Sequence, residues 1–153
     1  LIGRLAGGMV YGGAQTAFFI AVLLPFGLSI KSGPIGALVM LIGGVLTALA
    51  VGGLMGAMAI KTGSSEAVQG AFPLLFILLF FSSVFFPRQT MSGAYKAIAD
   101  ANPISYLAEG FRALTIESLN ATAVAEALLI PAGLSVLTLA LAMRTLRSRL
   151  AAS

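Results

Sequence analysis

Few residues of this chain are of types that carry out covalent chemistry, and they are scattered. Among its 153 residues there is no cysteine and no histidine, and only five are acidic. This composition excludes disulfides, thiol chemistry and the commonest metal ligands, and it leaves little from which to build an acid–base site. The glycine-rich stretches lack the Lys-Ser/Thr pair of a phosphate loop, and GxSxG and HExxH are absent. We therefore expect no catalytic, cofactor-binding or metal site here; the chain would not be an enzyme by itself.

Polar residues of more specific character gather between two apolar runs. Asn102-Pro103 is typical of a helix cap followed by proline at the first helical position. Glu109 and Arg112 are three residues apart and can form an ion pair. The intervening apolar residues fall on one helix face, at Ile104, Leu107, Ala108, Phe111 and Leu114. The pattern predicts a pair of short amphipathic helices, about residues 91–118, that lies in the membrane interface or re-enters the bilayer against protein.

The elements around these polar residues belong to a membrane protein. Hydrophobic residues make up 59% of the chain and charged residues only 9%, and the mean hydropathy is +1.04. Soluble domains usually carry about 25% charged residues, so this chain cannot cover itself with a water-soluble surface. The net charge of +4 comes from basic residues that stand mainly at the ends of apolar runs. That distribution favours contact with a lipid bilayer over a nucleic-acid partner.

Four apolar runs are long enough to cross a membrane. About 20 helical residues span the roughly 30 Å hydrocarbon core. The runs cover about residues 5–30, 34–60, 67–87 and 123–143. The predicted fold class is an all-α membrane protein: a polytopic bundle of four transmembrane helices, with the amphipathic pair between the third and the fourth. Residues 1–153 would form a single transmembrane domain.

Small residues recur on the first two runs at the spacing of one helix face. Gly8 and Gly12 form a GxxxG pair in the first run. Side chains this small let two helix backbones approach closely. The second run carries the longer series Gly44, Ala48, Gly52 and Gly56. This spacing predicts tight helix packing, within the chain or against a second copy.

The connection between the second and third runs is short and polar. Lys61, Thr62 and Glu66 belong to this KTGSSE segment, and Gly63 is placed to end the preceding helix. A serine in the segment can cap the next helix, with Glu66 favourable at its N-terminus. Two interpretations remain open: a plain antiparallel turn, or a contact point for a partner on that side of the membrane.

The third run carries an aromatic stripe. Its phenylalanines include Phe72, Phe76, Phe80 and Phe85, which fall largely on neighbouring turns of a helix. Such a stripe is more often a packing surface than a path for a substrate. Both interpretations are retained. Pro73 lies early in this run and is able to kink its helix.

Basic residues suggest which side of the membrane each segment faces. Four spans would place both ends of the chain, and the turn that begins at Lys61, on one side. Arg144, Arg147 and Arg149 follow the last span directly, where the bias towards the cytoplasm is strongest. We therefore expect both ends and the turn to be cytoplasmic, the amphipathic pair to be external, and the protein to lie in the plasma membrane.

The segment from Pro73 to Arg112 resembles one membrane-protein family. It contains FFP at residues 85–87, a short amphipathic helix, NPxxY at residues 102–106 and then Arg112. This order is similar to that in the permease subunits of type 2 ATP-binding-cassette exporters, which include drug, antibiotic and polysaccharide exporters. The chain departs from the family at Ser82-Ser83-Val84, where a typical member has a glycine.

The resemblance implies a fold and a set of partners. Family permeases have six spans, so this chain would be a C-terminal four-span portion lacking about two N-terminal spans. Two permease copies, identical or different, would enclose an export path for an amphipathic or apolar substrate such as a drug, antibiotic, lipid or glycan. A separate cytoplasmic ATP-binding-cassette ATPase would bind ATP and Mg and drive transport.

The resemblance also implies roles for particular residues. The path would be lined by Phe72, Phe76, Phe80 and Phe85. An external lid would contain Asn102, Pro103, Tyr106 and Arg112. The ATPase-facing turn would contain Lys61, Thr62 and Glu66. The alternative hypothesis is a membrane scaffold or assembly subunit that transports nothing, and a membrane-embedded enzyme is a third.

Overall fold

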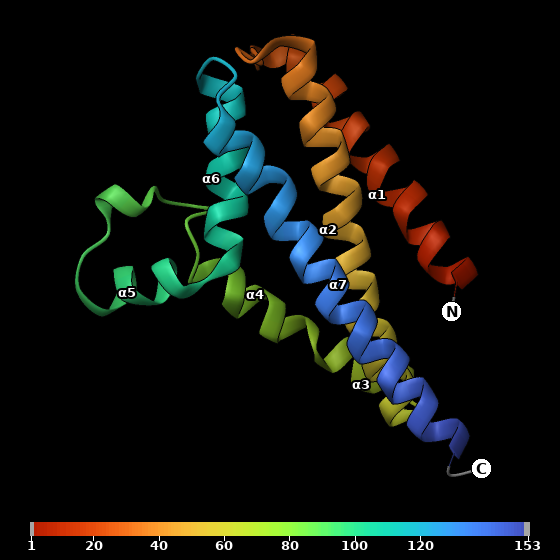
Figure 1. Cartoon of the computed structure of the whole chain (residues 1–153). Helices are drawn as coiled ribbons and strands as arrows, with labels where there is room; N and C mark the ends of the chain where they lie inside the picture. Colours follow the sequence, from red (N-terminus) through yellow and green to blue (C-terminus); the bar gives the residue numbers. More distant parts are fainter. Residues whose placement is uncertain (1, 152–153) are drawn as a thin grey trace.

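The computed structural model of the chain describes residues 2–151, and within them it is helical without strands (Figure 1). Three helices are long and apolar enough to cross a membrane: α1 (Ile2–Leu23), α2 (Gly33–Thr62) and α7 (Ala121–Ala151). They confirm the all-α fold, and they match the runs predicted near residues 5–30, 34–60 and 123–143 in length and apolar composition. The remaining elements are η1 (Leu24–Phe26), α3 (Ser65–Gly70), α4 (Phe72–Phe80), η2 (Arg88–Thr90), α5 (Gly93–Ala101) and α6 (Pro103–Ile116).

Helices α2 and α7 lie against each other because glycines on α2 allow close approach. A Cβ atom added to Gly43 would lie 2.6 Å from the carbonyl oxygen of Ala127, and one added to Gly53 would lie 2.7 Å from Thr138 Oγ1. Ser135 of α7 is buried, and its hydroxyl lies 2.8 Å from the carbonyl oxygen of Leu46. Small residues thus replace the large apolar contacts that hold helices together in water-soluble cores.

Part of the predicted small-residue face of α2 lies against α1. Gly44 and Ala48 face α1, where a Cβ atom on Gly12 would overlap that of Ala48 and one on Gly44 would overlap Thr16. Gly8, the other member of the predicted GxxxG pair, has nothing within 4 Å of an added Cβ atom. The close contact between α1 and α2 therefore depends on Gly12 rather than on the whole GxxxG motif.

The third predicted span, residues 67–87, is not one continuous helix. The helical structure breaks at Ala71 and ends at Phe80, and the longest apolar helical stretch is Val68–Phe80. Pro73 lies in the first turn of α4, where its missing N–H is tolerated but cannot continue a helix from α3. Ser82 Oγ then donates to Leu79 O at 2.6 Å and competes with the helical pattern. Four spanning helices are therefore not confirmed.

The two ends of the bundle are defined by polar contacts between distant segments. At one end, Arg149 Nη2 donates to the carbonyl oxygen of Lys61 at 2.7 Å, so the end of α7 meets the turn after α2. At the other end, Lys31 N donates to Thr115 O at 3.1 Å, so the connection between α1 and α2 meets the end of α6. Figure 1 shows the N-terminal end of α1 towards the same end of the bundle as the end of α7.

The turn after α2 has the predicted chemistry. Gly63 adopts a left-handed conformation with φ of +67°, and its N–H bonds to Ala59 O at 2.9 Å. Ser64 Oγ accepts from the backbone N–H of Glu66 at 3.1 Å, so Ser64 is the serine that caps α3. The hairpin between α2 and α3 is thus formed by local signals in the KTGSSE segment.

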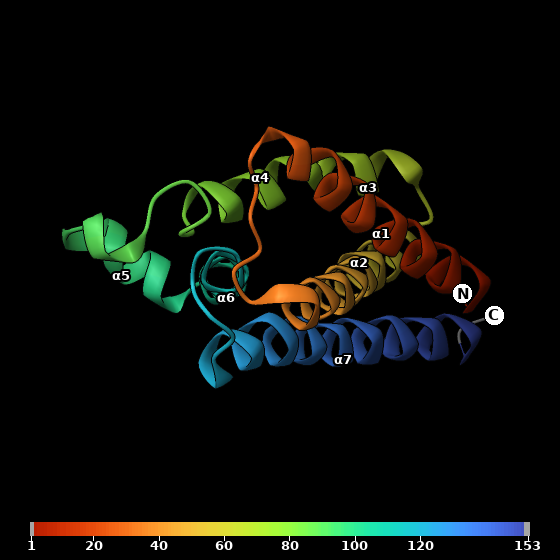
Figure 2. The same cartoon turned by 90° about the horizontal axis from the view of Figure 1, so that it is seen from above.

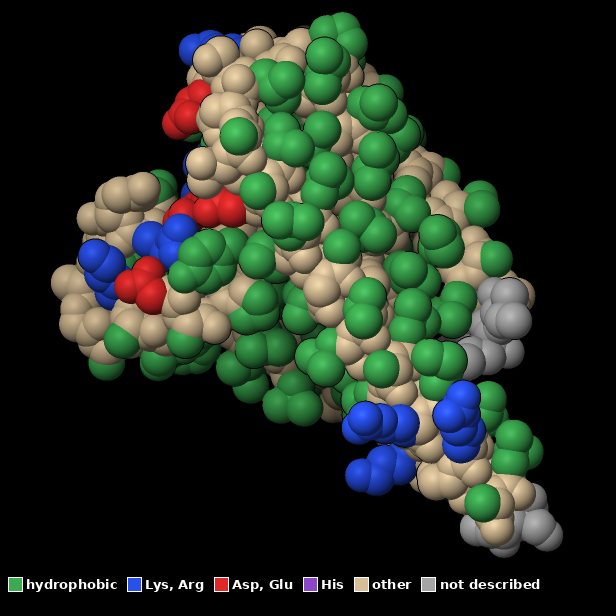
Figure 3. Space-filling model, in the orientation of Figure 1, with side chains coloured by type: hydrophobic (Ala, Val, Ile, Leu, Met, Phe, Trp, Pro, Cys, Tyr) green, Lys and Arg blue, Asp and Glu red, His purple; other side chains and the backbone are tan. Residues whose placement is uncertain are grey.

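The amphipathic pair predicted at residues 91–118 is present as α5 and α6. Helix α5 projects sideways from the bundle, whereas α6 runs beside α2 and α7 (Figures 1 and 2). Hydrophobic side chains cover much of the bundle surface, and charged side chains gather around α5 and α6 and near the end of α7 (Figure 3). Re-entry of the pair into the bilayer remains a prediction.

Candidate functional site

A polar junction joins residues 78–88 to α5 and α6. Two completely buried serines form its centre: Ser83 N donates to Ser105 Oγ at 3.1 Å, and Ser83 Oγ donates to Ser105 O at 2.8 Å. Buried polar groups are stable only when they are hydrogen-bonded, so the pair fixes the position of the turn that follows α4. We call this group of contacts between residues 78–88 and α5–α6 the polar junction.

Asn102 contributes to the junction in two directions. Its Oδ1 accepts from Ile104 N at 3.0 Å and caps α6, which begins at Pro103 as predicted. Its Nδ2 donates to Leu78 O at 2.7 Å and to Phe81 O at 3.1 Å. Carbonyl groups at the end of a helix have no partner within that helix. One buried amide therefore starts α6 and satisfies the end of α4.

Arg112 binds the same turn from the next part of α6. Its Nη2 lies 2.6 Å from Ser83 O and 3.3 Å from Val84 O. The predicted ion pair between Arg112 and Glu109 is wrong, because Glu109 binds Arg88 instead. Arg88 Nε donates to Glu109 Oε1 at 2.8 Å, and Arg88 Nη2 contacts Glu109 Oε2. A planar guanidinium binds a carboxylate best when two of its N–H groups reach the two carboxylate oxygens at once. The Arg88–Glu109 pair has this geometry, and the spacing of Glu109 and Arg112 along one helix is less suited to it.

Arg88 is the centre of the charged part of the junction. Its Nη1 lies 3.6 Å from Asp100 Oδ1, and its guanidinium carbon lies 4.2 Å from the centre of the Tyr106 ring. Tyr106 also donates its hydroxyl to Asp100 O at 2.8 Å. These contacts tie η2, the end of α5 and the first half of α6 together.

The ion pair shifts the pKa values of both partners. Partial burial of Glu109 opposes its charged form, but the hydrogen bonds and positive charge of Arg88 outweigh burial and lower the pKa of Glu109. The hydrogen bond to Glu109 raises the pKa of Arg88 above its ordinary value, against a smaller opposing effect of burial. Both groups are therefore charged at neutral pH.

The four residues that the sequence assigned to a lid all belong to this region. Asn102 and Pro103 begin α6, Tyr106 packs on Arg88, and Arg112 binds the turn after α4. Whether they close a path is not tested by these contacts. Sequence reasoning missed the contribution of Ser83, Ser105 and Arg88, and it gave Glu109 the wrong partner. The feature of the sequence that could have indicated these contacts is the pair of serines at Ser82-Ser83, which interrupts an otherwise phenylalanine-rich run.

A cavity of about 770 Å³ lies beside the junction, bordered by α1, α2, α4, α6 and α7. The predicted apolar face of α6 lines it, and α4 contributes Leu75, Leu78 and Leu79 but none of its phenylalanines. Such a volume lies within the range of about 300–1,000 Å³ for pockets that enclose drug-sized molecules. Its lining residues include Gln15, Thr16, Thr47, Leu54, Leu75, Leu78, Leu79, Ile104, Leu107, Ala108, Phe111, Arg112, Leu134 and Thr138.

The phenylalanine stripe faces outwards. Phe72, Phe76, Phe80 and Phe85 are each between 54% and 58% exposed, and they do not line the cavity. Phe80 and Phe85 stack on each other with ring centres 5.1 Å apart. The stripe is thus an apolar surface open to lipid or to a second copy. A substrate path and a packing surface both remain predictions for this stripe.

The turn that the resemblance assigned to an ATPase partner is also accessible. Lys61, Thr62 and Glu66 are exposed. Thr62 Oγ1 donates to Met58 O at 2.8 Å, and Arg149 binds Lys61 O. The turn and the end of α7 therefore form one polar surface at this end of the bundle.

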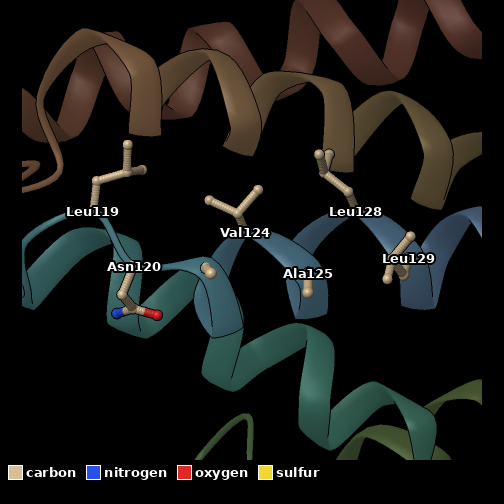
Figure 4. Close-up of a pocket in the computed structure, with 7 residues that line it drawn as sticks. Leu119, Asn120, Val124, Ala125, Leu128 and Leu129 are labelled. Carbon is tan, nitrogen blue, oxygen red and sulfur yellow. The ribbon is translucent and has the colours of Figure 1, made fainter.

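A second hollow, of about 430 Å³, lies at the start of α7 (Figure 4). Asn120 is its most polar lining residue, and its side chain points away from Leu119 and Val124. Asn120 Oδ1 accepts from Ala123 N at 2.7 Å and so caps α7. The polar group of this hollow thus has a structural role. Within residues 2–151, His, Cys, Asp and Glu side chains do not form a cluster able to hold a metal ion.

Comparisons with known proteins give two matches. Residues 1–116 match the family model described as ABC-2 type transporter. The chain is also 32% identical, over 118 residues, to the daunorubicin resistance ABC transporter permease protein DrrB1 of Streptomyces coeruleorubidus. That match covers 76% of this chain and 41% of the relative, so the chain spans about two fifths of the curated protein it matches. No solved structure matches the chain.

Proposed function

The chain belongs to the ABC-2 type transporter family, and on this premise we propose that it is part of the permease of an ATP-driven exporter. The observation that carries the proposal is the polar junction: Asn102 of NPxxY and Arg112 both bind carbonyl oxygens of the segment at the end of α4 that directly precedes FFP. The match to a drug-resistance permease supports the direction of transport, which is outwards.

A separate ATPase supplies the energy in this proposal. The chain carries no phosphate-loop motif, and the family is one of transport membrane subunits. Lys61, Thr62 and Glu66 face the cytoplasmic ATPase, beside Arg149 of α7, which binds the carbonyl oxygen of Lys61. The basic tail of α7 supports this orientation, because basic residues are retained on the cytoplasmic side of membrane segments. ATP and Mg are bound by the ATPase.

A second permease copy completes the path. The outward-facing stripe of Phe72, Phe76, Phe80 and Phe85 supports this arrangement, because an apolar surface of this kind is suited to a partner helix or to an apolar substrate. The lid consists of Asn102, Pro103, Tyr106 and Arg112, at the external end of the path. Its anchoring by the polar junction lets α5 and α6 move as one body with the end of α4.

An apolar or amphipathic drug is the proposed substrate. The relative from Streptomyces coeruleorubidus is named for daunorubicin resistance. Daunorubicin, together with other apolar drugs, is therefore the first panel to test on this transporter.

Copurification tests the partner directly. The full-length subunit is tagged, expressed together with the ATPase encoded beside it, and purified in mild detergent. We expect the ATPase to be retained, and charge reversal at Glu66 (Glu66→Lys) to reduce the retained amount. Glu117→Lys, an exposed change between α6 and α7, is the matched control. Complete failure to recover an ATPase would favour the scaffold hypothesis.

A further inference from the structure

We propose that the 770 Å³ cavity beside the polar junction binds a single-chain amphiphile with an acidic head group, whose head contacts Arg112. The site lies within one copy of the chain and is separate from the outward-facing phenylalanine stripe. This inference deepens the proposed function, on which it rests for the membrane setting. It adds a chemical class of ligand, carboxylate or phosphate on an apolar chain, and a residue that selects it.

The cavity walls are suited to an apolar chain. Aliphatic side chains from separate helices face it, among them Leu54 of α2, Leu78 of α4 and Leu134 of α7. The threonines of the lining are already bonded within their own helices: Thr16 Oγ1 donates to Gly12 O at 2.8 Å, and Thr47 Oγ1 donates to Gly43 O at 2.7 Å. These hydroxyls therefore add little polarity to the walls.

Arg112 differs from the other polar groups of the lining. A guanidinium has five N–H donors. In the described part of the chain, the hydrogen bonds of Arg112 all run from Nη2, to the carbonyl oxygens of Ser83 and Val84. The Nε and Nη1 donors are thus left for a further acceptor. A planar guanidinium binds a carboxylate or a phosphate through two donors at once.

The charges around the cavity favour an anionic head group. None of the residues that line it is acidic, and Arg112 is its basic residue. The other nearby arginine, Arg88, is paired with Glu109 and Asp100. The carbonyl oxygens that contact Arg112 carry only partial charge. An unbalanced positive charge beside an apolar cavity attracts anions and repels permanent cations more strongly than it would in water.

Photo-cross-linking in nanodiscs tests the proposal on the full-length subunit. The probe is palmitic acid carrying a diazirine in its chain, and the cross-linked residues are located by mass spectrometry. We expect cross-links on α2, α6 and α7 at cavity-lining residues. A matched diazirine alkyl-trimethylammonium probe should give about tenfold less labelling there, since a hydrogen bond to a charged group has an effect of this size.

Two variants, each with a control, distinguish the contribution of the head-group contact to labelling from the contribution of the apolar cavity walls. Arg112→Gln should reduce the labelling by palmitate about tenfold, whereas Arg144→Gln, an exposed change at the end of α7, should not. Ala108→Phe fills the cavity without removing a polar contact and should abolish labelling by both probes. Ala97→Phe, on the exposed side of α5, is its control. Cross-links restricted to outward-facing residues, or unchanged by Ala108→Phe, would overturn the proposal.

A third probe identifies the source of the ligand. A two-chain phospholipid bearing the same diazirine should label the outer surface of the bundle and not the cavity. Equal labelling of the cavity by this phospholipid would contradict a single-chain ligand. Failure of the cavity experiment with the ATPase still copurified would leave the proposed function intact. Cavity labelling by palmitate without any ATPase partner would support the site and refute the exporter.

Discussion

Ser83 and Ser105, 22 residues apart in the sequence, bond to each other through both backbone and side chain. Ser105 Oγ accepts from the N–H of Ser83, and the hydroxyl of Ser83 donates to the carbonyl oxygen of Ser105. Neither side chain is accessible to solvent. The turn after α4 and the first turn of α6 are therefore joined by buried hydrogen bonds whose atoms water does not reach.

Removal of one of these hydroxyls should destabilise the fold. Ser105→Ala leaves the buried N–H of Ser83 without its acceptor, which costs about 1–3 kcal/mol. We expect a lower thermal unfolding midpoint for the full-length subunit in detergent, measured by loss of monodispersity on heating. Ser92→Ala is the control, because Ser92 is exposed and its side chain makes no capping bond to α5. Equal midpoints for the two variants would show that the pair contributes nothing.

Asn102 allows helix capping to be separated from the contact with α4. Aspartate is as good a cap as asparagine, so Asn102→Asp keeps the acceptor for Ile104 N. It loses the donors to Leu78 O and Phe81 O and places a carboxylate against two carbonyl groups. We expect Asn102→Asp to destabilise the protein by about 1–3 kcal/mol, as judged from the same heating experiment. A neutral or stabilising effect would mean that only the cap matters.

The ion pair between Arg88 and Glu109 predicts an acid-sensitive stability. The pKa of Glu109 is lowered in the folded protein, so the contribution of the pair is fully present above the ordinary glutamate pKa of about 4.3. It is lost as the pH falls through the lowered folded value. The raised pKa of Arg88 has no effect in this acidic range.

Unfolding midpoints measured between pH 7 and pH 3 check this prediction. Glu109→Gln should lower the unfolding midpoint at pH 7. It should also reduce the further decrease of the midpoint as the pH is lowered. Glu117→Gln removes an exposed carboxylate that accepts a hydrogen bond from Asn120, and its midpoint should decrease towards acid as in the unaltered protein. An acid transition that is identical in the unaltered protein and in Glu109→Gln would rule out this pair as its source.

Two glycines of α1 provide a matched test of helix packing. Gly12→Ala places a methyl group onto Ala48 and should push α1 away from α2, whereas Gly8→Ala meets nothing within 4 Å. Alanine favours a helix over glycine by about 1 kcal/mol, so Gly8→Ala should be neutral or stabilising. Gly12→Ala should lower the unfolding midpoint despite that gain. A stabilising effect at both positions would contradict the close contact.

The phenylalanine stripe gives a test of path against packing. If the stripe lines a path between two copies, Phe76→Ala should reduce drug export while the amount of subunit in the membrane stays constant. Phe26→Ala, an exposed aromatic change beyond α1, is the control. Unchanged export in Phe76→Ala, with normal copurification of the ATPase, would favour packing over path.

Local patterns in the sequence were sufficient for much of the fold. The three long apolar helices follow from uncharged length, and the start of α6 follows from Asn102-Pro103, whose cap and first residue are neighbours in the chain. The turn at Gly63 was predictable for the same reason. The interruption of residues 67–87 was not, because an apolar run looks alike whether its helix is continuous or broken at Pro73.

The polar junction was only partly predictable, because its contacts are between distant segments. Glu109 has a basic residue three positions away, yet Arg88, 21 positions away, presents a two-pronged geometry that Arg112 does not. Ser83 belongs to the segment that departs from the family pattern, and no local pattern indicates that the fold brings it to Ser105. The leucines of α4 that line the cavity were likewise not predicted, because the phenylalanines were the more conspicuous residues of the same run.

ATP-dependent transport in inside-out membrane vesicles tests the central claim, that this chain belongs to an exporter driven by a partner. Vesicles contain the full-length subunit and its ATPase, and uptake of each drug in the panel is followed by fluorescence. The account predicts uptake that requires ATP and disappears when the catalytic lysine of the ATPase is replaced. Uptake that is unaffected by that replacement, or absent for every drug while both subunits are present, would contradict it.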